Sequence, residues 1–354
     1  MPTLAKSGEA FGSGRTFCRA TLRAQTVPVI EIEVDVADLA QVRFTTDAVW
    51  ETTASIHAFV FLRHHLLHQR LRRLVPKRPD FDLEHLLTLA RNPDWLPDVW
   101  APAPSARPGH PLEQLAALRH TDPAVAEADL EQLRTLAPDS SAARMEPQEY
   151  LDRTAEALEG WWTAVLEPLW DRVDAIQRAD IAHHQAALAT RGLAATMPEL
   201  HRGLGFERGR LRVDLGEGLV SLKSCGRGIW FMPSVFRWPW VALDTRETVP
   251  PVVSYGARGA GRVWQRPGRE SSAGLPDLIG RSRALILESL DVPRSTTTVA
   301  QSLGLSLSTV SEHLSVLAAA GLLESRRDGQ RVLYWRTMIG DLLVDGESAA
   351  RLLG

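Results

Sequence analysis

A short stretch near the carboxyl-terminal end of the sequence concentrates small polar side chains that can contact nucleic acid. Small hydroxyl groups allow a helix to enter a DNA major groove about 12 Å wide, where they contact base edges or phosphates. Arginines follow closely, and their guanidinium groups suit phosphates or the minor groove. Arg336 extends this cationic segment. The residues for which we predict DNA contacts are Ser306, Ser308, Thr309, Ser311, Glu312, His313, Ser315, Arg326, Arg327, Gln330 and Arg331.

These side chains need a helix and a hairpin to position them. Val310, Leu314 and Leu317 recur at helical spacing, which predicts one buried helix face after a cap at Ser306. Asp328-Gly329 is a strong two-residue hairpin signal. Two helices are expected before this unit. The first begins at Asp277 and ends before Pro293, and the second begins at Ser295–Thr297 and stops at Gly304. Helix, helix, tight turn, helix and hairpin are the layout of a winged helix-turn-helix over residues 277–340.

Residues 297–323 closely resemble the arsenical-repressor (ArsR) type of winged helix. The match lies in the Ser-Thr-Val-Ser-x-His-Leu core at 308–314, the later Ala-Gly-Leu and the arginine-rich Asp-Gly wing. The resemblance implies a homodimer that places one recognition helix in each DNA half-site. The sequence departs from metal-sensing members, because residues 275–354 contain no Cys and only one His, His313. We therefore expect no metal and no cofactor.

The rest of the chain is expected to be mainly α with a small antiparallel β meander. We interpret residues 1–27 as a disordered leader, 28–265 as a dimerisation or effector domain, 266–276 as a linker and 341–354 as a terminal helix. A strand is predicted at 28–36, and glycines punctuate short β-favouring runs after Gly205. Predicted helices cover 46–74, 81–90, 112–119, 124–136 and 147–191, the last kinked or divided at Pro168.

This amino-terminal part faintly resembles the helical domain that precedes the winged helix in long actinobacterial-type regulators. The segments 231–239 and 255–259 carry that resemblance, which implies no activity. Stacked aromatics could line an effector pocket, although core packing is the commoner use of tryptophan. The candidates for the pocket are Trp161, Trp162, Trp170, Trp230, Trp238 and Trp240.

No spacing in the chain indicates catalysis, so we do not expect an enzyme. His64, His65 and His68 lie among arginines with no carboxylate between them, which favours a packing or basic face over a metal site. Cys18 and Cys225 are expected to be reduced thiols.

The overall charge of −3 does not favour nucleic acid, so DNA binding must depend on a local patch. No apolar run is long enough for a membrane span, and we expect a cytoplasmic protein. The sequence therefore predicts a homodimeric repressor that binds double-stranded DNA and responds to a small-molecule effector. Two alternatives stay open: a small-molecule-binding or enzymatic domain fused to a DNA-binding tail, and an adaptor whose winged helix binds a protein.

Overall fold

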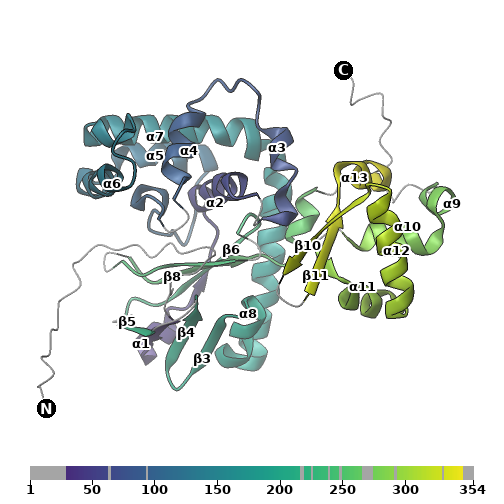
Figure 1. The fold of residues 1–354 in the computed structure, drawn as a ribbon. Coiled ribbons are helices and arrows are strands. Elements are labelled where there is room, and N and C mark those ends of the chain that lie inside the picture. Colours follow the sequence, from purple (N-terminus) through teal and green to yellow (C-terminus); the bar gives the residue numbers. More distant parts are fainter. Residues whose placement is uncertain are drawn as a thin grey trace, which may run out of the picture.

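The computed structural model separates the winged-helix elements from a larger body of helices and sheets (Figure 1). Within the described residues, no helix combines the length and the apolar character needed to cross a membrane. The expected leader, most of the expected linker, His64, Gln330, Trp238 and both cysteines fall outside those residues. The structure describes residues 29–62, 65–92, 95–215, 219–224, 226–237, 240–246, 249–264, 274–290, 293–328 and 331–345.

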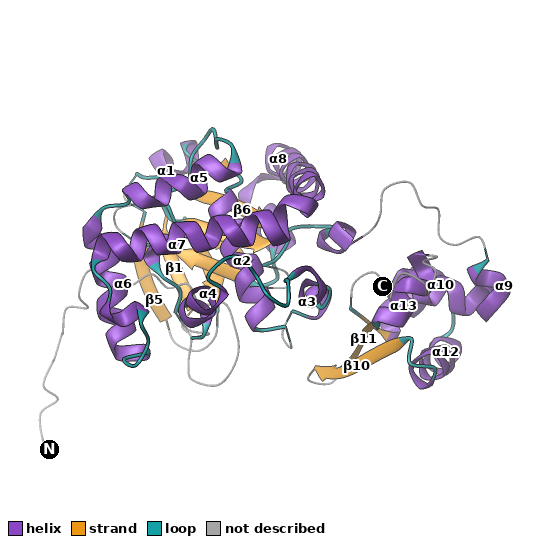
Figure 2. Ribbon diagram, turned by 90° about the horizontal axis from the view of Figure 1, so that it is seen from above, coloured by secondary structure: helices purple, strands orange, loops and turns teal. Residues whose placement is uncertain are grey.

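Most helices of the larger body contribute to one apolar core and lie over the strands (Figures 1 and 2), while the end of α8 packs against the strands in a second core. In Figure 2, α7 crosses in front of the sheets. Asp47 caps α2 by accepting from the backbone N–H groups of Val49 and Trp50. The helices are α1 Val36–Ala40, α2 Ala48–Val60, α3 Leu71–Leu74, α4 Leu83–Ala90, α5 Pro111–Ala117, α6 Pro123–Leu136, α7 Pro147–Trp161 and α8 Trp170–Leu200.

The predicted single helix over 46–74 is wrong. Helix α2 ends at Val60, and a 3₁₀ turn over Leu66–His68 precedes the short α3. The His68 ring packs 4.9 Å from the ring of Phe236 and 6.0 Å from that of Trp264. These tertiary contacts outweigh the helical spacing of the local sequence.

Pro168 divides the long helical stretch, as expected. A π turn at Trp162–Leu166 and a 3₁₀ turn at Glu167–Leu169 separate α7 from α8. Helix α8 is itself kinked at Gly192, whose φ of 76° lies in the left-handed region.

The expected small antiparallel meander is only partly correct, because the strands form two mixed four-stranded sheets in the orders β3-β4-β1-β5 and β2-β6-β8-β7. Strand β1 is antiparallel to β4 and parallel to β5, and β6 is parallel to both β2 and β8. Parallel neighbours need long connections: the helices between β2 and β3 lie within those of β1 with β5 and of β2 with β6, and the segment that carries β7 joins β6 to β8. The strands are β1 Val29–Glu33, β2 Arg43–Phe44, β3 Leu204–Glu207, β4 Arg210–Asp214, β5 Leu219–Lys223, β6 Trp230–Ser234, β7 Val241–Asp244 and β8 Val252–Gly256.

The carboxyl-terminal elements enclose their own apolar core. The expected first helix is two helices, because Gly280 adopts a φ of 86° between α9 and α10. A two-residue strand, β9, adds a third strand to the predicted hairpin by pairing with β11. The elements are α9 Leu275–Ile279, α10 Arg281–Ser289, β9 Arg294–Ser295, α11 Thr296–Leu303, α12 Leu307–Ala319, β10 Leu323–Asp328, β11 Arg331–Arg336 and α13 Met338–Asp345.

One carboxylate joins the two parts of the molecule. Arg70 in the larger body lies 2.6 Å from Asp341 of α13 and donates to the backbone carbonyl of Trp264 at 2.6 Å. Asp341 also pairs with Arg336 of β11 at 2.9 Å. Because the side chains of Arg70, Asp341 and Arg336 are at most 18% exposed, solvent screens this network only in part.

Candidate nucleic-acid interface

The buried face of α12 is the one that the sequence predicts. Val310 and Leu314 are 0% exposed and Leu317 is 1% exposed, and all three belong to the core that α10 and α11 share with α12. Burial of such side chains supplies most of the stability of a short helix. The opposite face is therefore fixed toward the surface.

The predicted contact residues of α12 are brought together on this outer face. Ser308, Ser311 and Ser315 are exposed, as is Glu312, while Thr309 and His313 are half-buried. Ser315 donates to the carbonyl oxygen of Ser311 at 2.9 Å, so its oxygen remains able to accept. The face consists of short polar side chains that would not hold the helix away from a groove floor.

Ser306 caps the amino terminus of α12. Its Oγ accepts from the backbone N–H of Thr309 at 3.1 Å and lies 2.9 Å and 2.8 Å from the hydroxyl oxygens of Ser308 and Thr309. This confirms the predicted cap and adds a structural role to Ser308 and Thr309, for which the sequence predicts only DNA contacts. An anion at this helix end would meet a cluster of hydroxyls beside the positive end of the helix dipole.

The wing presents cations along its two paired strands. The register places Arg326 opposite Leu333 and Arg327 opposite Val332. Arg327 and Arg331 are exposed, and Arg326 is half-buried. These guanidinium groups can approach a phosphate backbone.

Arg336 is not part of this cationic surface, contrary to the expectation from sequence. Its guanidinium pairs with Asp341 and donates to the carbonyl oxygens of Leu287 and Glu288 at 3.1 Å and 3.2 Å. Those carbonyls lie in the last turn of α10, where the helix dipole favours a cation. The side chain is 10% exposed, so Arg336 holds the wing against the helices.

The described tryptophans among those predicted for an effector pocket lie in different parts of the larger body. Trp161 and Trp162 are buried in the helical core. The indole N–H of Trp161 donates to Ser55 Oγ at 2.9 Å, and the ring centroids of Trp162 and Trp170 lie 4.6 Å apart. Trp230 lies apart in β6, below the guanidinium of Arg43. Trp240 is half-buried ahead of β7.

The histidine cluster packs inside the larger body. His57, His65 and His68 are each at most 1% exposed, and neighbouring rings lie 5.5 Å and 6.3 Å apart. Burial lowers the pKa of His68 to about 3, which keeps that ring neutral. Across the ranges that the structure describes, no group of three or more His, Cys, Asp or Glu residues could hold a metal ion.

One buried carboxyl, that of Glu51, has a pKa near neutral, which is the range that suits a general base. Burial raises the pKa of Glu51 to about 7, against the opposing effect of its hydrogen bonds and of Arg237. Its Oε1 accepts from the backbone N–H groups of Val235 and Phe236 at 2.8 Å and 3.1 Å, and its Oε2 accepts from Gln177 at 3.0 Å. Glu51 is 1% exposed, so its carboxylate is out of reach of solvent. Its hydrogen bonds connect α2 to α8 and to the turn after β6, which is a structural role.

Comparisons with known proteins give one match in each of two separate segments of the chain. Residues 281–326 match a family described as a helix-turn-helix domain. Residues 116–261 match a family of unknown function, DUF5937. No curated protein and no solved structure matches the chain. The first match extends from α10 into β10, and a helix-turn-helix domain indicates a DNA-binding regulator.

Proposed function

We propose that this protein is a transcriptional regulator of ArsR type that binds double-stranded DNA as a homodimer, without a metal site. Helix α12 is the recognition helix and the β10–β11 hairpin is the wing. The larger body senses a small-molecule effector and performs no catalytic step. Repression is the proposed outcome, because a bound dimer would compete with other proteins for the same duplex.

The observation that carries this proposal is the division of α12 into two faces. Val310, Leu314 and Leu317 are buried in the core, while the centre of the outer face offers hydroxyls, one carboxylate and one imidazole. A helix that bound a protein partner would be expected to present aromatic or aliphatic anchors at its centre. Leu307 and Val316 are exposed, but they flank a centre made of Ser311, Glu312 and Ser315.

Charge gives the second argument. The chain has a net charge of −3, so a general attraction to polyanions does not explain binding. Arg326, Arg327 and Arg331 concentrate positive charge on the wing. The proposal therefore requires DNA affinity that depends on these residues.

Replacing Arg326 and Arg327 together by Ala tests this requirement. Each arginine that contacts a phosphate adds about 1 to the slope of log affinity against log salt, so the double variant should lose a slope of about 2 and bind every duplex more weakly. Fluorescence anisotropy with a labelled duplex over a salt series measures both quantities.

The matched control is the double variant Arg210→Ala and Arg212→Ala, which removes two exposed arginines of β4. Its slope and affinity should equal those of the unchanged protein. If both double variants had the unchanged slope, the wing would not contact DNA, and an adaptor role would become the better account.

A further inference from the structure

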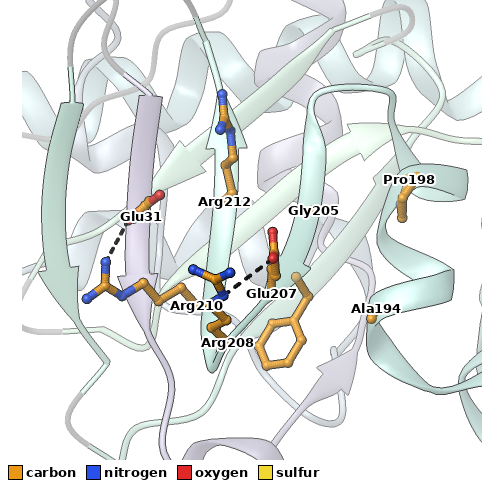
Figure 3. A pocket seen from close by; sticks show the side chains of 9 residues that line it. Glu31, Ala194, Pro198, Gly205, Glu207, Arg208, Arg210 and Arg212 are labelled. Atoms are coloured by element: carbon orange, nitrogen blue, oxygen red, sulfur yellow. Dashed lines mark hydrogen bonds and ion pairs between the residues drawn. The ribbon is translucent and has the colours of Figure 1, made fainter.

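Three cavities of the larger body differ in whether the arginines that line them pair with carboxylates of the protein itself. The first, about 680 Å³, lies between the β3–β4 hairpin and the kinked part of α8 (Figure 3). Its arginines have acidic partners: Arg208 lies 3.6 Å from Glu207 and Arg210 lies 3.1 Å from Glu31. The protein itself thus supplies anions for these cations.

The second cavity, about 1350 Å³, lies beside the amino-terminal part of α4 and along α7 and has mainly acidic walls. Its cation, Arg153, is 2.5 Å from Asp82, and this contact helps to lower the pKa of that carboxyl. A set of solvated carboxylates on helix faces needs no ligand.

The third cavity, about 430 Å³, contains a cation, Arg43, that has no acidic partner among the described residues. It lies between the edge strand β2 and α8, and its volume falls in the range of about 300–1,000 Å³ typical of small-molecule sites. Arg43 and Gln185 supply its polar groups, while Phe44, Leu188 and Trp230 supply much of its apolar surface.

The exposed side chain of Arg43 lies above an aromatic ring. Its guanidinium carbon lies 5.7 Å from the centroid of the Trp230 ring, within the range of a cation–π contact. Within the ranges that the structure describes, Arg43 forms no ion pair with a carboxylate. A guanidinium in a cation–π contact retains its N–H donors, which can bind a carboxylate in a bidentate manner.

We propose that this cavity is the effector site and that it takes a small carboxylate with an apolar body. The carboxylate pairs with Arg43, the amide of Gln185 supplies a second hydrogen bond, and the apolar body lies against Phe44, Leu188 and Trp230. A polyanion would place a second charge against these apolar walls, and a neutral ligand would gain no ion pair with Arg43.

This proposal rests on the proposed function for its regulatory consequence. Helix α8, which carries Gln185 and Leu188, also holds the segment before the winged helix, because Arg172 donates to the carbonyl of Val263 at 2.9 Å. The next residue, Trp264, accepts from Arg70, which pairs with Asp341 of α13. An effector that shifts α8 would therefore act on contacts that reach the winged helix.

Calorimetric titration of the full-length protein with three probes tests the site. We expect 2-naphthoate to bind, and 2-naphthamide and acetate to bind at least about tenfold more weakly, because each lacks one of the two required features. Arg43→Gln and Trp230→Leu should each weaken 2-naphthoate at least about tenfold. Arg208→Gln, the matched change in the first cavity, should leave its affinity unchanged.

Equal affinities for the acid and the amide, or an unchanged affinity in Arg43→Gln, would overturn the assignment of the site. Duplex affinity measured with and without 2-naphthoate separates this result from the proposed function. If 2-naphthoate alters the duplex affinity of the protein without substitutions but not that of Arg43→Gln, regulation through this cavity is supported. If 2-naphthoate binds and the duplex affinity stays the same, that regulation is overturned. Absence of duplex binding under all conditions would contradict the proposed function, while the titrations would still decide the ligand site.

Discussion

Replacing Ser311 by Glu is expected to reduce DNA affinity by at least about 100-fold while leaving the protein folded. Ser311 is exposed at the centre of α12, and a carboxylate there would face the phosphates of a duplex that the helix had entered. Like charges brought together in an interface cost several kcal/mol, which corresponds to a factor of this size. Anisotropy titration with a duplex enriched from a random library by the unsubstituted protein measures the loss, and circular dichroism checks the helix content.

The control is Ala175→Glu, which adds the same charge to an exposed position of α8. It changes the net charge equally, so it should reproduce any general repulsion from DNA without blocking the recognition helix. Equal affinities of the two variants would mean that α12 does not enter the groove.

Replacing Leu314 by Ala is expected to destabilise the winged helix by about 2–5 kcal/mol. The side chain is 0% exposed, so its truncation removes buried contacts and leaves a cavity between the helices. Hydrogen exchange of the α12 backbone amides in the full-length protein measures the effect locally. A loss of about 2 kcal/mol corresponds to roughly 30-fold faster exchange through unfolding.

Val316→Ala is the matched change two residues further along the same helix. Val316 is 45% exposed, and alanine favours helix, so exchange should change little. If Val316→Ala destabilised α12 as strongly as Leu314→Ala, the outer face would be packed against something, either the larger body or a second protein.

The winged helix could be predicted from sequence because its signals are local. Ser306 accepts from a backbone N–H three residues away, and Gly304 ends α11 in the left-handed conformation with a φ of 65°. The wing turns where Asp328-Gly329 predicts a hairpin, because β10 ends at Asp328 and β11 begins at Arg331. Each of these features depends on residues that are close together in the chain.

The sheets could not be predicted in the same way. Strand β1 lies between β4 and β5, so Ile32 pairs with Leu211 and Leu222, far along the chain. Strands β2 and β9 have two residues each, which is too short for an alternating pattern to appear. Tertiary pairing alone makes these segments into strands.

The candidate sites show the same limit. The sequence predicts Trp230 as a pocket residue because it is aromatic. It gives no sign of Arg43, which lies above the Trp230 ring but comes from a distant part of the chain. From the sequence alone, Arg336 is predicted to continue the cationic wing. Its inward direction depends on Asp341 and on the carbonyl groups at the end of α10, which no local pattern reveals.

The most direct test of the central claim is selection of bound fragments from a random duplex library with the full-length protein, followed by a salt titration on the enriched sequence. A homodimeric winged helix predicts a palindrome whose half-sites are centred about 10–10.5 base pairs apart, or a multiple of that spacing, with affinity that falls steeply as salt increases. Failure to enrich any sequence, together with duplex retention that does not depend on salt, would contradict the account and leave α12 as a surface for some other partner.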